Sequence, residues 1–254
     1  MGMSVSAGIG AVPMALLGVH IAAAVAATGA GGASFLARKG GPLHVRAGRI
    51  FVPAMFSMYG FGVVYAAFDP TPDPILTVAA VIGAYLVATA WRTAKRRDGT
   101  AGRFEHAAFA VILACLALSL AFLYLASTSP DGRFFRHGPA TIMPNIIISS
   151  LAASFDLAFI LRGRLTANQR IARHVWRVSV AMLMVTFSTF AGDQAQKVFP
   201  DAIRGSFFLV LPAIAVLLAM VYWLVRLRFG RGMRRRAQKP DRNAATLAPR
   251  RSTA

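Results

Sequence analysis

The stretch AAFAVILACLALSLAFLYLA, residues 107–126, is twenty residues long and contains no charged side chain. About 20 apolar residues in a helix cross the hydrocarbon core of a bilayer. The stretch is apolar on every side, which excludes an amphipathic helix on the surface of a soluble protein. It also lacks the alternating pattern of a transmembrane β-strand. It therefore predicts a membrane-spanning helix.

Apolar blocks of similar length occur along the whole chain. Seven of them lie near residues 12–36, 49–68, 74–91, 105–127, 139–161, 174–192 and 206–227. They predict an all-α fold, a polytopic transmembrane bundle of seven spans. The chain then divides into a short external N-terminus at 1–11, a seven-helix membrane domain at 12–227 and a basic, disordered cytoplasmic tail at 228–254.

The overall composition agrees with a membrane protein. Hydrophobic residues make up 56% of the 254 residues and charged residues 15%, whereas soluble domains have about 45–50% and 25%. Such a chain has too few polar residues to cover a soluble surface. The single cysteine, Cys115, excludes an internal disulfide, and the chain has no CxxC pair for redox chemistry or zinc.

Basic residues are unevenly distributed between the links. Of the 28 Lys and Arg residues, 24 lie in or beside alternate links or in the tail after Val225, and the other four are Arg133, Arg136, Lys197 and Arg204. Cytoplasmic loops attract Lys and Arg, so the 24 are expected inside the cell. Seven spans then place the N-terminus outside and the C-terminus inside. The expected location is a bacterial inner (cytoplasmic) membrane, crossed several times.

The net charge of +19 indicates a negatively charged partner. In a soluble protein it would indicate nucleic acid, but here the basic residues alternate with apolar blocks. We therefore expect no nucleic acid as a partner. The basic links and the tail are instead expected to lie on anionic lipid of the bilayer, with about 1 kcal/mol per basic residue near the surface. The sequence leaves the oligomeric state open.

Three histidines occupy equivalent positions. His44, His106 and His174 each stand at the cytoplasmic start of a span that runs outward. Imidazole ligates haem iron and relays protons near neutral pH, so two of the three could hold one haem. The alternative is an interfacial role, with each polar tip among the lipid headgroups. His137 falls in an outer link and is expected to be solvated.

One acidic residue lies well inside a span. Asp156 stands about 9 Å above the cytoplasmic end of its helix, at 1.5 Å per residue. An ionisable residue at that depth should face the bundle interior and have a partner. We expect His44, Asp156, His174 and Arg177 to form one polar cluster, which His106 could join. The cluster could relay protons in a carrier, or it could be an Asp–Arg pair that only ties two helices together.

Several motifs resemble a known family. They include Arg38-Lys39-Gly40-Gly41-Pro42-Leu43-His44-Val45-Arg46, Phe155-Asp156-Leu157 and Arg170-Ile171-Ala172-Arg173-His174-Val175-Trp176-Arg177. This combination, over about residues 16–228, resembles a bacterial membrane family of unknown function, the DUF2306 type. Val45 stands where the family pattern has a second Arg. The resemblance implies a multi-spanning membrane protein and brings no activity with it.

The chain lacks the motifs that would assign a reaction. It has no HExxH, no GxSxG and no Walker A sequence, so no enzyme activity is assigned. The leading interpretation is an integral membrane protein of unknown activity with a polar cluster on its cytoplasmic side. The alternatives are a redox protein that binds one haem through histidines and a proton-coupled transporter that uses Asp156.

Overall fold

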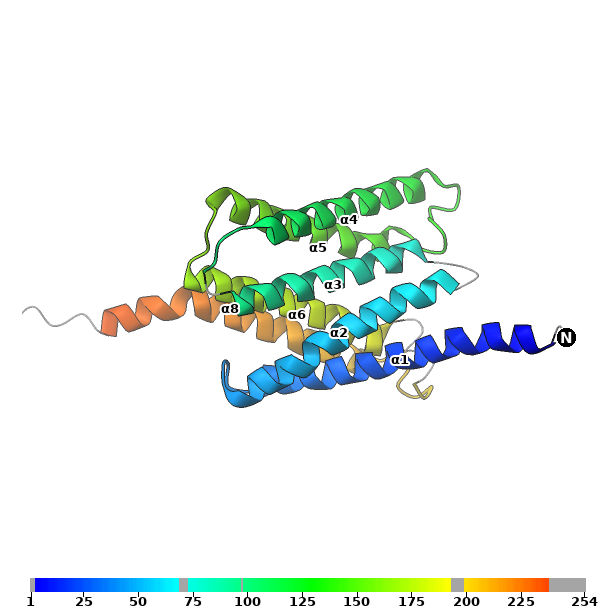
Figure 1. Ribbon diagram of the computed structural model, residues 1–254, viewed down its shortest axis with the longest axis horizontal. Coiled ribbons are helices and arrows are strands. Elements are labelled where there is room, and N and C mark those ends of the chain that lie inside the picture. Colours follow the sequence, from blue (N-terminus) through cyan, green and yellow to red (C-terminus); the bar gives the residue numbers. More distant parts are fainter. Residues whose placement is uncertain (1–2, 69–72, 97, 193–198, 238–254) are drawn as a thin grey trace, which may run out of the picture.

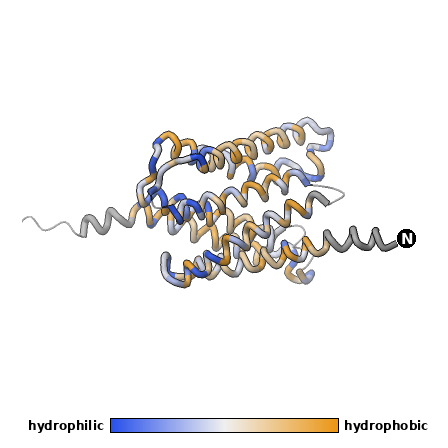
Figure 2. Tube along the Cα trace, viewed as in Figure 1, coloured by the Kyte–Doolittle hydropathy of each residue, from blue (hydrophilic) through white to orange (hydrophobic). Residues whose placement is uncertain are grey.

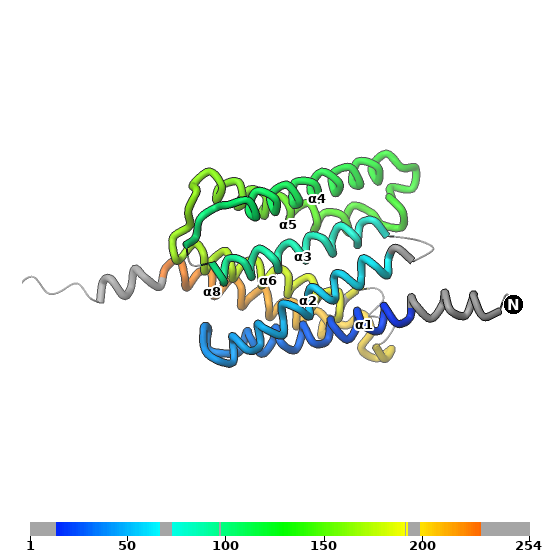
Figure 3. Tube along the Cα trace, viewed as in Figure 1, coloured from blue at the N-terminus to red at the C-terminus, as the bar shows by residue number. Residues whose placement is uncertain are grey.

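The computed structural model describes residues 3–68, 73–96, 98–192 and 199–237 (Figure 3). Its elements are α1 (Met3–Leu36), α2 (Pro42–Phe68), α3 (Pro74–Lys95), α4 (Arg103–Thr128), α5 (Pro139–Arg162), α6 (Ala167–Ala191), the 3-10 turn η1 (Phe207–Leu209) and α8 (Leu211–Ala237). Among the described residues the only β-structure is two isolated bridges. The all-α prediction is confirmed.

Six of the helices are long and apolar enough to cross a membrane: α1, α2, α3, α4, α5 and α8. The hydropathy-coloured trace shows apolar residues along the middle of the bundle and polar residues gathered at its ends (Figure 2). This is a multi-pass membrane protein. The remaining long helix, α6, carries Arg170, Arg173 and Arg177 in its first half.

The helices run along the long axis of the molecule (Figure 1). Helices α3 and α6 pack against each other in the middle of the bundle. The α1–α2 hairpin packs on one side of this pair, α4 and α5 lie on the other, and α8 packs against α6. The central helices are therefore the ones whose polar residues are removed from lipid.

The N-terminal end of α3 is fixed by Asp73. One carboxylate oxygen of Asp73 accepts hydrogen bonds from the backbone N–H groups of Ile75 and Leu76, each at 3.1 Å, which caps the helix. The other oxygen lies 2.5 Å from Nε2 of His137 in the α4–α5 link. His137 was expected to be solvated, but its side chain is only 15% exposed. The prediction for His137 was wrong because the partly buried carboxylate of Asp73 needs a hydrogen-bond partner, and His137 provides it.

At the end of the bundle opposite Asp73, the α3–α4 and α5–α6 links are joined by backbone hydrogen bonds. Ala101 N donates to the Gly163 carbonyl and Leu165 N donates to the Gly99 carbonyl, both at 2.9 Å. We call these paired segments, residues 99–101 and 163–165, the loop clasp. Gly99 has φ +66°, and a Cβ there would lie 2.8 Å from the Leu165 carbonyl oxygen. Only glycine permits this approach.

Helix extends beyond both ends of the predicted membrane domain, 12–227. Helix α8 continues to Ala237, so residues 228–237 of the predicted disordered tail are helical. Arginine is a strong helix former, and this segment extends a helix that has already been nucleated. At the other end α1 begins at Met3, within the predicted external segment 1–11. The rest of the predicted tail, residues 238–254, lies outside the described residues.

Candidate functional site

Helix α5 presents a buried polar face to the bundle interior. Asn145, Ser149 and Asp156 lie on this face and are 5%, 0% and 1% exposed. Their spacing places them on one side of the helix, as the sequence indicates. The Asn145 amide donates to the Ile75 carbonyl of α3 at 3.1 Å. The polar face of α5 is therefore directed at α3.

Asp156 is held by two arginines from α6. Its Oδ1 accepts from Arg173 and from Arg177, each at 2.5 Å. The Arg177 side chain is fully buried and that of Arg173 is 8% exposed. The two arginines are four residues apart and so share a helix face. Charge-assisted contacts of this kind are the strong class of hydrogen bond.

Helix α3 supplies the hydroxyl groups. Tyr85 donates its hydroxyl to Asp156 Oδ2, and Arg177 donates to the Thr89 hydroxyl. One turn further on, Arg173 Nε donates to the Thr93 hydroxyl at 3.3 Å. The buried cluster thus consists of Tyr85, Thr89, Thr93, Asp156, Arg173 and Arg177. The three α3 residues recur every four positions, which matches the spacing of the two arginines.

Aromatic rings cover the guanidinium groups. The Arg173 guanidinium carbon lies 4.8 Å from the Phe159 ring centroid. That of Arg177 lies 5.1 Å from the Tyr85 ring and 5.6 Å from the Trp176 ring. Cations over aromatic faces are stabilised by the ring quadrupole, most strongly where water is excluded. The rings therefore lower the cost of keeping two cations in the bundle.

The start of α6 explains how its arginines enter the bundle. Thr166 accepts from Gln169 N at 3.4 Å, and the Gln169 side chain accepts from Thr166 N at 2.9 Å. This capping box begins the helix at Ala167, well before its apolar part. Arg173 and Arg177 consequently lie on the second and third turns, at the depth of Asp156.

His44, His106 and His174 occupy different surroundings. Nδ1 of His174 donates to the Ala90 carbonyl of α3 at 3.1 Å, and Nδ1 of His44 donates to the Ser34 carbonyl at 3.2 Å. His106 is exposed on α4, and its Nδ1 donates to the Gly102 carbonyl within its own helix end.

The predicted cluster is therefore assembled only in part. Asp156 and Arg177 are in direct contact. His174 lies on the same helix as Arg177 but bonds to the α3 backbone, and His44 bonds to Ser34 between α1 and α2. His106 lies on the helix that packs against α3 and α5. Within the described residues, no three His, Cys, Asp or Glu side chains are close enough to hold a metal ion.

A small hollow opens beside the loop clasp. Its volume is about 20 Å³, and it is lined by Arg92, Thr93, Arg96, Asp98, Gly99, Thr100, Glu105, Phe159, Leu165 and Arg170. Outside the membrane-spanning part, Arg96 donates to Asp98 and this hydrogen bond lowers the pKa of Asp98. Thr93 and Phe159 belong to the wall and also contact Arg173. The hollow therefore adjoins the buried cluster.

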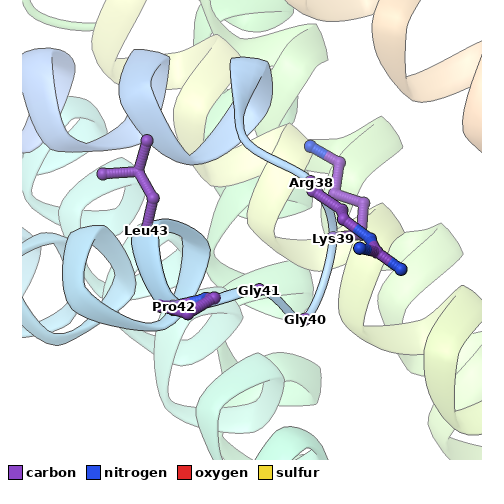
Figure 4. Close-up of a pocket in the computed structure, with 6 residues that line it drawn as sticks. All are labelled: Arg38, Lys39, Gly40, Gly41, Pro42 and Leu43. Atoms are coloured by element: carbon purple, nitrogen blue, oxygen red, sulfur yellow. The ribbon is translucent and has the colours of Figure 1, made fainter.

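A wider crevice of about 270 Å³ lies at the α1–α2 link. Arg38, Lys39, Gly40, Gly41, Pro42 and Leu43 line it (Figure 4). Lys39 is already engaged, because its Nζ donates to the carbonyls of Ser34 and Phe35 and lies 5.2 Å from the Trp223 ring. The link thus closes the end of α1 against α8.

Sequence reasoning missed Arg173 and the hydroxyls of α3. It grouped His174 and Arg177 of α6 with Asp156, whereas the α6 residues that meet Asp156 are Arg173 and Arg177. The recurrence of Tyr85, Thr89 and Thr93 every four residues was the available signal. Comparison with family models, curated proteins and solved structures finds no match to this chain.

Proposed function

We propose that the protein is a proton-coupled carrier of the bacterial inner membrane, of the DUF2306 type, with the buried cluster as its relay. In this proposal α6 is a seventh span, the N-terminus is outside and the C-terminus is inside. Two observations support the seventh span. At 25 residues α6 is long enough to cross, and its Arg173 and Arg177 side chains are buried against residues of α3 and α5.

The buried cluster is the observation that carries the proposal. Ionisable side chains inside membrane spans are costly, and they usually mark ion pathways or proton relays. Here a carboxylate, a phenol and two guanidiniums from three helices are in direct contact. A structural tie between two helices needs only one acid and one base. The phenol is a second group that could exchange a proton with the carboxylate, and the second arginine adds a fixed positive charge beside them.

Proton flux into proteoliposomes tests the carrier. With an imposed membrane potential, we expect the wild-type protein to acidify or alkalinise the vesicle interior, and Asp156→Asn to abolish the flux. Asp131→Asn, on the exposed α4–α5 link, should leave it unchanged. Tyr85→Phe keeps all charges in place and should reduce the flux. Equal flux in all four proteins, or none in the wild type, would reject the carrier.

Reporters at both chain ends test the topology. Seven spans place the ends on opposite sides of the membrane, so a C-terminal green fluorescent protein should fluoresce in the cytoplasm. An N-terminal tag should be accessible to protease from the periplasm. If α6 does not cross, the two ends lie on the same side.

A redox role is the second candidate, supported by the geometry of two histidines. His44 and His174 each direct Nδ1 at a backbone carbonyl, an arrangement that fixes the ring and leaves Nε2 free to ligate iron. A visible spectrum of protein expressed with excess haem tests this role. A Soret band that His174→Ala abolishes would support it, and a colourless protein would reject it.

A further inference from the structure

The buried cluster carries more positive than negative charge. Two guanidiniums, Arg173 and Arg177, face one carboxylate, Asp156, and all three side chains are buried. Arginine stays protonated in proteins, so one positive charge has no acidic partner within the cluster. A buried charge without compensation is costly. The cluster would therefore be stabilised by an anion nearby.

The adjoining hollow is also rich in arginine. Arg92, Arg96 and Arg170 line it, together with Asp98 and Glu105. Arg92 is paired with Glu105 and Arg96 with Asp98, so the positive charge without an acidic partner is that of the buried cluster. The hollow shares Thr93 and Phe159 of its wall with Arg173 of that cluster.

The hollow also contains a donor that lacks an acceptor. Nε of Arg92 is buried and has no hydrogen-bond partner among the described residues. Oε1 of Glu105 lies 3.8 Å away, beyond hydrogen-bond length. A buried N–H of this kind costs about the desolvation free energy of the group unless an acceptor occupies the space beside it.

The size of the hollow limits the occupant. About 20 Å³ is enough for one water-sized particle, which needs about 10–15 Å³ measured in this way. A halide ion is of this size, whereas sulfate and phosphate, with five heavy atoms, are larger. Size and charge together select a small monatomic anion.

We propose that the hollow between α3, α4, α5 and α6 binds a chloride-sized anion through Arg92 Nε, in the field of Arg170 and Arg173. This deepens the proposed carrier function by naming an anion as the co-transported or regulatory ligand of the same site. The anion compensates the excess charge of the buried cluster from its cytoplasmic side.

Line broadening of the chloride NMR signal by the detergent-purified protein tests the binding. We expect a saturable broadening. Bromide should remove it by competing for the site, whereas sulfate at equal ionic strength should leave it in place. Arg92→Gln should weaken the binding about tenfold, the effect of losing one charge-assisted hydrogen bond. Arg103→Gln is the matched control, because Arg103 is exposed on the same side of the protein and its loss changes the net charge equally.

The outcomes separate the two proposals. No saturable broadening, equal competition by sulfate, or equal binding by Arg92→Gln and the wild type would overturn the anion site. The competition series needs only the wild-type protein, so it decides even if Arg92→Gln does not fold. Halide binding without proton flux would uphold the anion site and reject the carrier. Proton flux without halide binding would uphold the carrier and reject the anion site.

Discussion

Asp156→Ala should destabilise the protein by about 3–5 kcal/mol, because it leaves two buried guanidiniums without their carboxylate. Arg173 and Arg177 both bond to Asp156, and neither can move into water without leaving the bundle. The measurement is reversible unfolding of the protein in bicelles by titration with a denaturing detergent, followed by circular dichroism.

A fully apolar variant provides the control for this prediction. Replacing the whole ion-paired group by hydrophobic residues of similar size is often neutral or stabilising. We therefore expect Asp156→Leu combined with Arg173→Met and Arg177→Met to be more stable than Asp156→Ala alone. If Asp156→Ala unfolds like the wild type, the carboxylate does not compensate the arginines and the charge argument fails.

Asp73→Ala should be the second largest change, a loss of about 2–4 kcal/mol. The substitution removes the N-terminal cap of α3, typically about 1 kcal/mol, and a hydrogen bond to a carboxylate, about 1.5–3 kcal/mol. Both contacts come from one carboxylate, which meets Ile75 N, Leu76 N and His137. Unfolding in bicelles measures the loss.

Asp73→Asn separates the two contributions. The amide oxygen of asparagine can still accept from the helix N–H groups, since Asn is as good a cap as Asp. The charge that His137 contacts is lost, so we expect about half the effect of the alanine variant. Asparagine and alanine variants of equal stability would show that the cap contributes nothing.

The sequence predicts how far along its helix a residue lies better than it predicts which neighbouring helix the side chain faces. Asp156 and Arg177 could be paired in advance because a lone acid inside a span needs a cation at the same depth. Their contact in the structure follows from that requirement. The hydroxyls of Tyr85 and Thr89 could not be assigned, because such residues are tolerated in spans without a charged partner.

His106 illustrates the same limit. Its depth matches that of His44 and His174, and on depth alone the three could share a site. In the structure His106 points away on α4, because the side toward which a helix turns depends on which neighbours it packs against. Likewise Arg170 and Arg173 are only three residues apart, and tertiary packing decides that Arg173 meets Asp156 while Arg170 lines the hollow.

The contacts of Arg173 and Arg177 also constrain how the chain enters the membrane during synthesis. An arginine at the centre of an isolated membrane helix costs about 2.5–3.5 kcal/mol on insertion scales, and α6 carries two arginines whose charge is compensated by residues of other helices. The side-chain acceptors of Arg173 and Arg177 lie earlier in the chain, on α3 and α5. The carboxylate and the hydroxyls are therefore synthesised before α6. A nascent chain that lacked α3 or α5 would leave the two arginines of α6 without these acceptors.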